Sequence, residues 1–140
     1  MVQKSVLAVG LDPAVLDFSK FPGFTAEQFR QFIDAQIERV RAHGFDVTSC
    51  LIDLGETAEA TATAALKSKR WDCVVIGAGL RQPPERLLLF EKIINLIHAL
   101  APNASICFNT RPDDTVEAVE RWIQGWPRDA RCARRRIVVP

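Results

Sequence analysis

Two glycines and an arginine follow the third strongly apolar run of the sequence, and these residue types are suited to binding an anion. Gly77 and Gly79 come directly after residues 73–76, and Arg81 follows two positions later. Glycine leaves backbone N–H groups open to a ligand, and a guanidinium pairs well with phosphate. The complete G-x-G-x-x-G fingerprint of dinucleotide binding is missing. The segment therefore has two interpretations, an anion site or a tight turn with Arg81 in solvent, and the turn is the simpler one.

Two aspartates stand where apolar runs end. Asp12 precedes Pro13 after the first run, and Asp53 precedes Gly55 by two positions after the second. If their loops converge, the two carboxylates could hold a divalent metal or act as an acid–base pair. Neither belongs to a spaced ligand motif, and both fit turns that end strands. We therefore keep both as candidate ligand-binding residues and predict no metal site.

A third group of polar residues, Asn109, Thr110 and Arg111, follows the fourth apolar run. It could clamp a polar ligand, although a cap for the following helix is a simpler role. Catalytic residues cannot be assigned, because no serine or cysteine stands beside a histidine in a recognisable motif. His43 and His98 both fall inside or at the end of expected helices, where structural roles are expected.

The elements that position these residues alternate between short apolar strands and amphipathic helices. Strands are predicted at residues 5–10, 45–54, 73–76 and 104–108, and helices at 25–43, 57–70, 83–101 and 112–123. Repeated β-α units require right-handed crossovers, so the prediction is a doubly wound, three-layer α/β/α fold with a mostly parallel sheet of four or five strands. The carboxyl ends of parallel strands share one edge, and this would gather the candidate residues, together with Asp113, along a single rim.

The end of the chain is basic. Five arginines stand between residues 128 and 136, whereas the whole chain has a formal charge of only +1. We assign residues 1–127 to a single α/β domain and residues 128–140 to a basic tail or edge strand, with residues 137–139 favoured as a fifth strand. Nucleic-acid binding is not expected, because aromatic residues are not interleaved with these arginines.

The amino-acid composition is typical of an ordinary globular protein. The chain has 140 residues, of which 48% are hydrophobic and 25% are charged, and this suits one domain. No signal-peptide pattern or bilayer-spanning run is present, so no membrane association is expected. The four cysteines lack zinc-ligand spacing, and three of them lie in apolar runs. Buried free thiols suit a reducing compartment, so the expected location is the cytoplasm.

Three segments carry a resemblance to a known family. The order of features in three segments resembles that of the receiver domain of bacterial response regulators. These segments are RAHGFDV, AALKSKRWDCVVIGAGLRQPP and INLIHALAPNASICFNT. The resemblance covers about two thirds of the chain and implies a flavodoxin-like (Rossmann-like) topology with strand order 2-1-3-4-5.

The chemistry of that family is not reproduced in this sequence. Gly77 stands where the receiver's phosphoacceptor aspartate would follow the third strand, and Asp12 is the only acidic residue in the first-strand turn. Val139 and Pro140 replace the usual lysine–proline pair, and only Thr110 approximates the expected hydroxyl. The resemblance therefore implies a receiver-like module that cannot be phosphorylated.

These observations leave two function classes. The first is a receiver-like protein-interaction or signalling module that acts through a protein partner or as a homodimer. The alternative is a small enzyme or binding protein for a phosphate-bearing or other anionic metabolite at the carboxyl ends of the strands. The FMN and cobalamin signatures are absent, so no cofactor is predicted.

Overall fold

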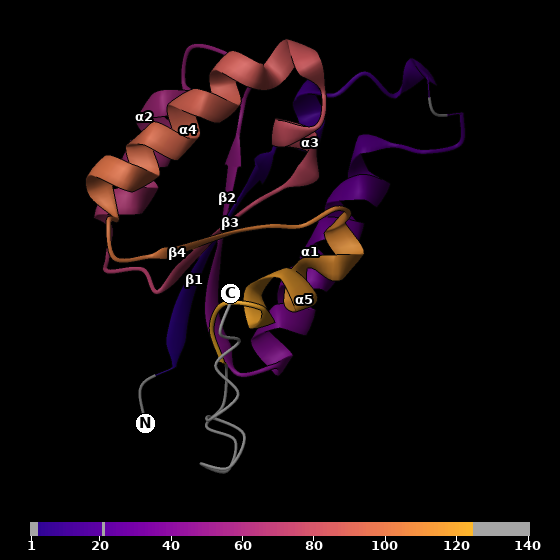
Figure 1. Cartoon of the computed structure of the whole chain (residues 1–140). Coiled ribbons are helices and arrows are strands. Elements are labelled where there is room, and N and C mark those ends of the chain that lie inside the picture. Colours follow the sequence, from indigo (N-terminus) through magenta and orange to yellow (C-terminus); the bar gives the residue numbers. More distant parts are fainter. Residues whose placement is uncertain (1–2, 21, 125–140) are drawn as a thin grey trace, which may run out of the picture.

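A parallel sheet with helices on both faces organises the chain (Figure 1). The computed structural model describes residues 3–20 and 22–124. The strands are β1 (Lys4–Leu11), β2 (Phe45–Ile52), β3 (Cys73–Ile76) and β4 (Ser105–Phe108). The helices are α1 (Ala26–Ala42), α2 (Ala58–Lys67), α3 (Ala78–Arg81), α4 (Leu87–Leu100) and α5 (Thr115–Glu120). Single 3-10 turns occupy Pro13–Val15, Phe18–Lys20, Pro84–Arg86 and Pro112–Asp114.

The strand order is β2-β1-β3-β4, and every neighbouring pair is parallel. This confirms the predicted doubly wound α/β class with a flavodoxin-like order. The chain leaves β1 toward one edge of the sheet and returns from β2 to the other side of β1, so strand order reverses between β1 and β3. The predicted fifth strand at residues 137–139 and the basic segment 128–140 lie outside the described residues.

Helix α1 begins and ends where its sequence signals indicate. The Thr25 hydroxyl accepts a hydrogen bond from the backbone N–H of Gln28 at 3.1 Å, and the Gln28 side chain accepts one from the Thr25 N–H at 2.9 Å. This reciprocal capping box satisfies N–H groups that the first turn would leave unpaired. The helix stops before Gly44, whose φ of 95° favours glycine.

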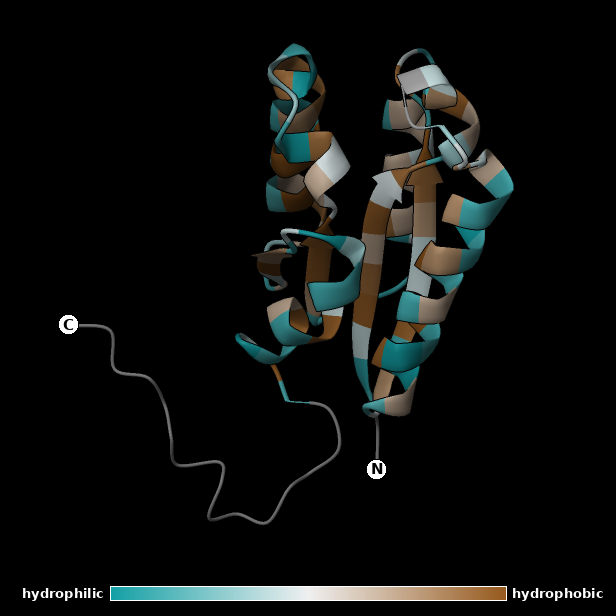
Figure 2. Cartoon of the chain, turned by 90° about the vertical axis from the view of Figure 1, so that its right-hand side faces the viewer, coloured by the Kyte–Doolittle hydropathy of each residue, from teal (hydrophilic) through white to brown (hydrophobic). Residues whose placement is uncertain are grey.

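Two apolar layers flank the sheet, and hydrophobic residues are frequent in the strands that separate them (Figure 2). On one face, α2, α3 and α4 pack on Leu7, Val9, Val74 and Ile76. On the other face, α1 and α5 pack on Val6, Phe45, Val47, Cys73, Val75 and Cys107. Strand β3 is buried at all four positions, as expected for a strand covered on both sides.

Several boundaries differ from the sequence prediction. The second strand stops at Ile52 instead of residue 54, because Asp53 turns the chain by accepting a hydrogen bond from the Gly55 N–H. The third helix was predicted from residue 83, but a 3-10 turn occupies Pro84–Arg86 and α4 begins only at Leu87. The short helix α3, which precedes this turn, was not predicted. Among the described residues, no helix combines the length and apolarity needed to cross a bilayer.

Candidate functional site

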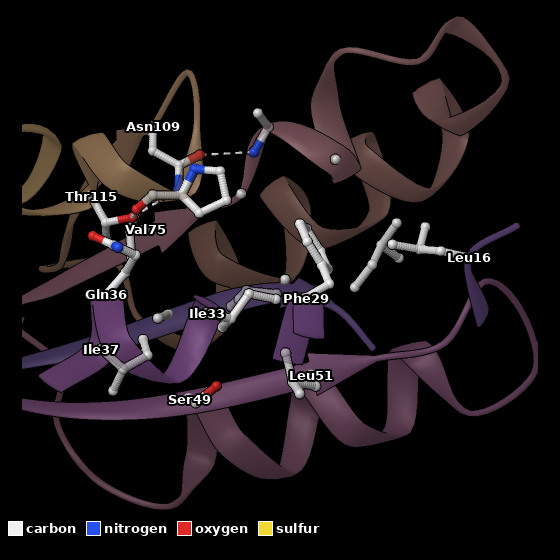
Figure 3. Close-up of a pocket in the computed structure, with 18 residues that line it drawn as sticks. Leu16, Phe29, Ile33, Gln36, Ile37, Ser49, Leu51, Val75, Asn109 and Thr115 are labelled. Atoms are coloured by element: carbon white, nitrogen blue, oxygen red, sulfur yellow. Dashed lines mark hydrogen bonds between the residues drawn. The ribbon is translucent and has the colours of Figure 1, made fainter. Parts of the chain in front are cut away.

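A cavity of about 160 Å³ lies between helix α1 and the carboxyl ends of β1, β2 and β3 (Figure 3). Its floor is the sheet, and α1 forms one wall through Phe29, Ile33 and Ile37. The segment after β4 adds Asn109 and Pro112 at one end. This position coincides with the reversal of strand order, where open α/β sheets commonly bind ligands.

The cavity exists because the sheet carries small side chains at this point. In β1 the positions that face α1 are Val6, Ala8 and Gly10, so side-chain size falls toward the carboxyl end. Ala8 pairs in register with Ser49 of β2, which is also small. A Cβ atom added at Gly10 would have only the Leu51 Cδ2 atom within 4 Å, at 3.9 Å. Helix α1 therefore spans a region of the sheet that no side chain fills.

The apolar end of the cavity is held by packed aromatic rings. Phe29 lies with its ring centroid 6.1 Å from those of Phe18 and Phe24, which belong to the segment before α1. Leu16 and Leu51 complete this end. Tilted and edge-on aromatic contacts at such distances are favourable. The contact between Phe18 and Phe29 therefore holds the loop after β1 against α1, and this loop borders the cavity on that side.

The polar end is built on Asn109, which is only 7% exposed. Its Oδ1 atom accepts a hydrogen bond from the Ala78 N–H at 2.8 Å, and its Nδ2 atom donates to the Thr115 hydroxyl at 3.0 Å. The Thr115 hydroxyl in turn donates to the Pro112 carbonyl at 2.6 Å. Asn109 thus ties the start of α3 to the start of α5 and fixes its own amide orientation.

Gln36 of α1 also faces this polar end. Figure 3 shows its side chain beside Thr115, and within the described residues its amide group forms no hydrogen bond. Gln36 continues the stripe formed by Phe29, Ile33 and Ile37, so it is a polar residue in an otherwise apolar helix face. Its amide is therefore free to bind a ligand.

The predicted anion-binding residues divide between two places. Gly77 and Gly79 line the cavity. Arg81 does not line it: its guanidinium donates to the Asn109 carbonyl at 2.7 Å and lies 5.2 Å from the centre of the Phe108 ring. Two N–H groups of the glycine turn are already used, since Gly77 donates to the Val9 carbonyl at 2.9 Å and Ala78 donates to Asn109. The arginine and the free backbone groups are therefore not aimed at one point.

The two candidate aspartates form local contacts at adjacent loops. Asp12 accepts a hydrogen bond from the Ala14 N–H at 3.0 Å and pairs with Arg30 at 2.7 Å. Asp53 accepts from the Thr57 hydroxyl and the Gly55 N–H, and these bonds lower its pKa. Within the described residues, no group of three or more histidine, cysteine, aspartate or glutamate side chains is arranged to hold a metal ion. Both aspartates act as turn residues in this structure.

The residues after Asn109 form a helix cap. The N–H and hydroxyl of Thr110 both donate to Asp114, and the Arg111 N–H donates to the same carboxylate at 3.2 Å. Partial burial raises the pKa of Asp114, but these hydrogen bonds outweigh it and lower the pKa below its ordinary value. The Arg111 side chain is largely exposed and pairs with Asp113 at 2.6 Å. Thr110 and Arg111 therefore lie outside the cavity wall.

The sequence predicted three residues that line the cavity, Gly77, Gly79 and Asn109. It did not single out Gln36 or the small residues of the cavity floor, Ala8, Gly10 and Ser49. The available signal was the polar position within the buried stripe of α1. Comparison of the chain with protein-family models, with curated proteins and with solved structures found no significant match.

Proposed function

We propose that this protein binds a small organic molecule in the cavity beneath α1. The observation that carries the proposal is the cavity itself: its walls are mostly apolar, and hydrogen-bonding groups gather at one end around Asn109. Small-molecule sites in proteins have this composition, in which an apolar lining provides affinity and a few polar groups orient the ligand.

This proposal keeps the ligand-binding alternative that the sequence suggested and changes the expected ligand. A phosphate-bearing metabolite is less well supported, because Arg81 is turned toward Asn109 and Phe108 and two N–H groups of the glycine turn are occupied. An apolar molecule instead gains from leaving water, at about 25 cal/mol for each Å² of apolar surface buried.

A thermal-shift screen of metabolites with a cavity-filling variant tests the proposal. Gly10→Val places three carbon atoms in the cavity, whereas Gly55→Val, the matched control, adds them where no atom lies within 4 Å. A ligand present at about 100 times its Kd stabilises the folded state by about 2.7 kcal/mol. We expect hits that stabilise the wild type and Gly55→Val but not Gly10→Val. No hits, or hits indifferent to Gly10→Val, would contradict the proposal.

A second candidate function is a receiver-like module that self-associates without being phosphorylated. Gly77 follows β3 directly, so no carboxylate stands there, and the start of α4 exposes Leu87 and Leu88 by 54% and 78%. Adjacent exposed leucines favour an apolar contact with a second copy of the chain. Light scattering should then detect a dimer that Leu88→Glu dissociates, and incubation with acetyl phosphate and Mg²⁺ should add no mass. A monomer at all concentrations, or a stable aspartyl phosphate, would argue against this candidate.

A further inference from the structure

The free hydrogen-bonding groups of the cavity are both donors and acceptors. Within the described residues, neither the Gln36 amide nor the Ser49 hydroxyl forms a hydrogen bond, and both groups line the cavity. An amide side chain offers two N–H donors and a carbonyl acceptor, and a hydroxyl offers one donor and an acceptor. Gln36 is half-buried and Ser49 is exposed, so solvent hydrates both groups in the free protein. A ligand that displaces this solvent keeps all of their hydrogen bonds only if it both donates and accepts.

Charge is absent from the cavity wall. None of the described residues that line it has a charged side chain. Two of the arginines around it form ion pairs, Arg30 with Asp12 and Arg39 with Glu117. Arg81 forms no ion pair within the described residues and its buried Nε atom has no hydrogen-bond partner, but its guanidinium donates to the Asn109 carbonyl, lies against the Phe108 ring and does not line the cavity. A charged ligand would lose its hydration without meeting a counter-ion in the cavity wall, and this is costly.

The size of the cavity limits the apolar part of the ligand. Its volume is about 160 Å³, and an apolar cavity of about 150 Å³ is known to hold one benzene molecule. Phe29, Leu16 and Leu51 surround the end opposite Asn109, so this is where a ring would lie (Figure 3). The polar group of the ligand would then point toward Gln36.

We propose that the ligand is an uncharged molecule of about one ring that carries an amide-like group, and that Gln36 recognises that group. This inference rests on the proposed function, because it names the ligand class of the same site. Asn109 supports the arrangement as a positioning residue, since its hydrogen bonds to Ala78 and Thr115 fix the polar end of the cavity. Gln36 then determines specificity, and the apolar walls supply most of the affinity.

Four probes of nearly equal shape test the proposal: benzamide, toluene, benzoate and benzylamine. Their dissociation constants are measured by NMR titration of the full chain. We expect benzamide to bind most tightly, and benzoate and benzylamine to bind at least about tenfold more weakly than benzamide because their charge is not compensated. Gln36→Leu should weaken benzamide about three- to tenfold, the value of one or two hydrogen bonds, and should leave toluene nearly unchanged. Gln31→Leu is the matched control, because Gln31 contacts Glu27 on the exposed side of α1.

The outcomes separate this inference from the function on which it rests. If benzoate or benzylamine binds as tightly as benzamide, or if Gln36→Leu weakens benzamide no more than Gln31→Leu does, the inference is overturned while cavity binding stands. If neither these probes nor any hit of the metabolite screen shows binding that Gly10→Val abolishes, the proposed function fails as well.

Discussion

The substitution Gly10→Ala tests whether the space beneath α1 is open in the folded protein. Gly10 lies in the extended strand β1, and its new Cβ atom would meet only Leu51 Cδ2, at an ordinary contact distance of 3.9 Å. The folded state therefore accommodates the methyl group without strain. Glycine within a strand is less stable than alanine by about 0.5–1 kcal/mol, chiefly because it gives the unfolded chain more freedom. We expect the free energy of unfolding to rise by about that amount.

Urea unfolding monitored by circular dichroism measures this change in the free energy of unfolding. Two control variants provide an unstrained and a strained reference value. Gly55→Ala places its methyl group where no atom lies within 4 Å, so it reports the effect on the unfolded chain alone. Gly44→Ala forces alanine to a φ of 95° and should lower stability by about 1–2 kcal/mol. If Gly10→Ala destabilises the protein as much as Gly44→Ala does, the floor of the cavity is tighter than its geometry indicates, and the reasoning is refuted.

Three further predictions concern the framework around the site. Thr25→Ala removes the side-chain half of the α1 capping box and should lower the free energy of unfolding by about 1 kcal/mol in the same urea assay; an unchanged value would show that the cap contributes nothing. Hydrogen bonding between Cys73 and Cys107, together with burial, raises the pKa of the Cys73 thiol, so labelling with a disulfide reagent at about pH 8 should modify these two cysteines only after unfolding; fast labelling of the native protein, located by peptide mass, would contradict the packing. The pKa of Asp114 is lowered in the folded protein, so its contribution to stability is complete above its ordinary value of 3.8 and is lost as the pH falls through the folded value. Asp114→Asn should therefore reduce the fall in stability on acidification, and an unchanged acid transition would count against the hydrogen bonds from Thr110.

The sequence predicts the framework well where the signals are local. The capping residues Thr25 and Gln28 and the stop at Gly44 locate α1, and the wholly apolar segment of β3 identifies a central strand. Four β-α units were sufficient to predict the parallel sheet. The prediction that the residues after Asn109 belong to a helix start could also be made from the sequence, because the hydrogen bonds from Thr110 and Arg111 to Asp114 join residues only a few positions apart.

The site is harder to predict from the sequence, because it depends on contacts between segments that are far apart in the chain. Space beneath α1 arises only when Ala8, Gly10 and Ser49 are brought together on adjacent strands, and none of these residues is unusual by itself. The direction of Arg81 depends on Asn109, which lies 28 positions later in the chain. The close spacing of Gly77, Gly79 and Arg81 in the sequence therefore suggested an anion site. In the folded protein, packing turns the Arg81 guanidinium toward Asn109 instead.

The most direct test of small-molecule binding is a methyl NMR titration of the full chain with benzamide. Saturable shifts with a single Kd should be confined to methyl groups at the cavity, those of Leu16, Ile33 and Leu51. The methyl groups of Leu66 and Ile97, which are buried on the opposite face of the sheet, should not move. Shifts that do not saturate, or that affect both faces equally, would contradict a binding site beneath α1.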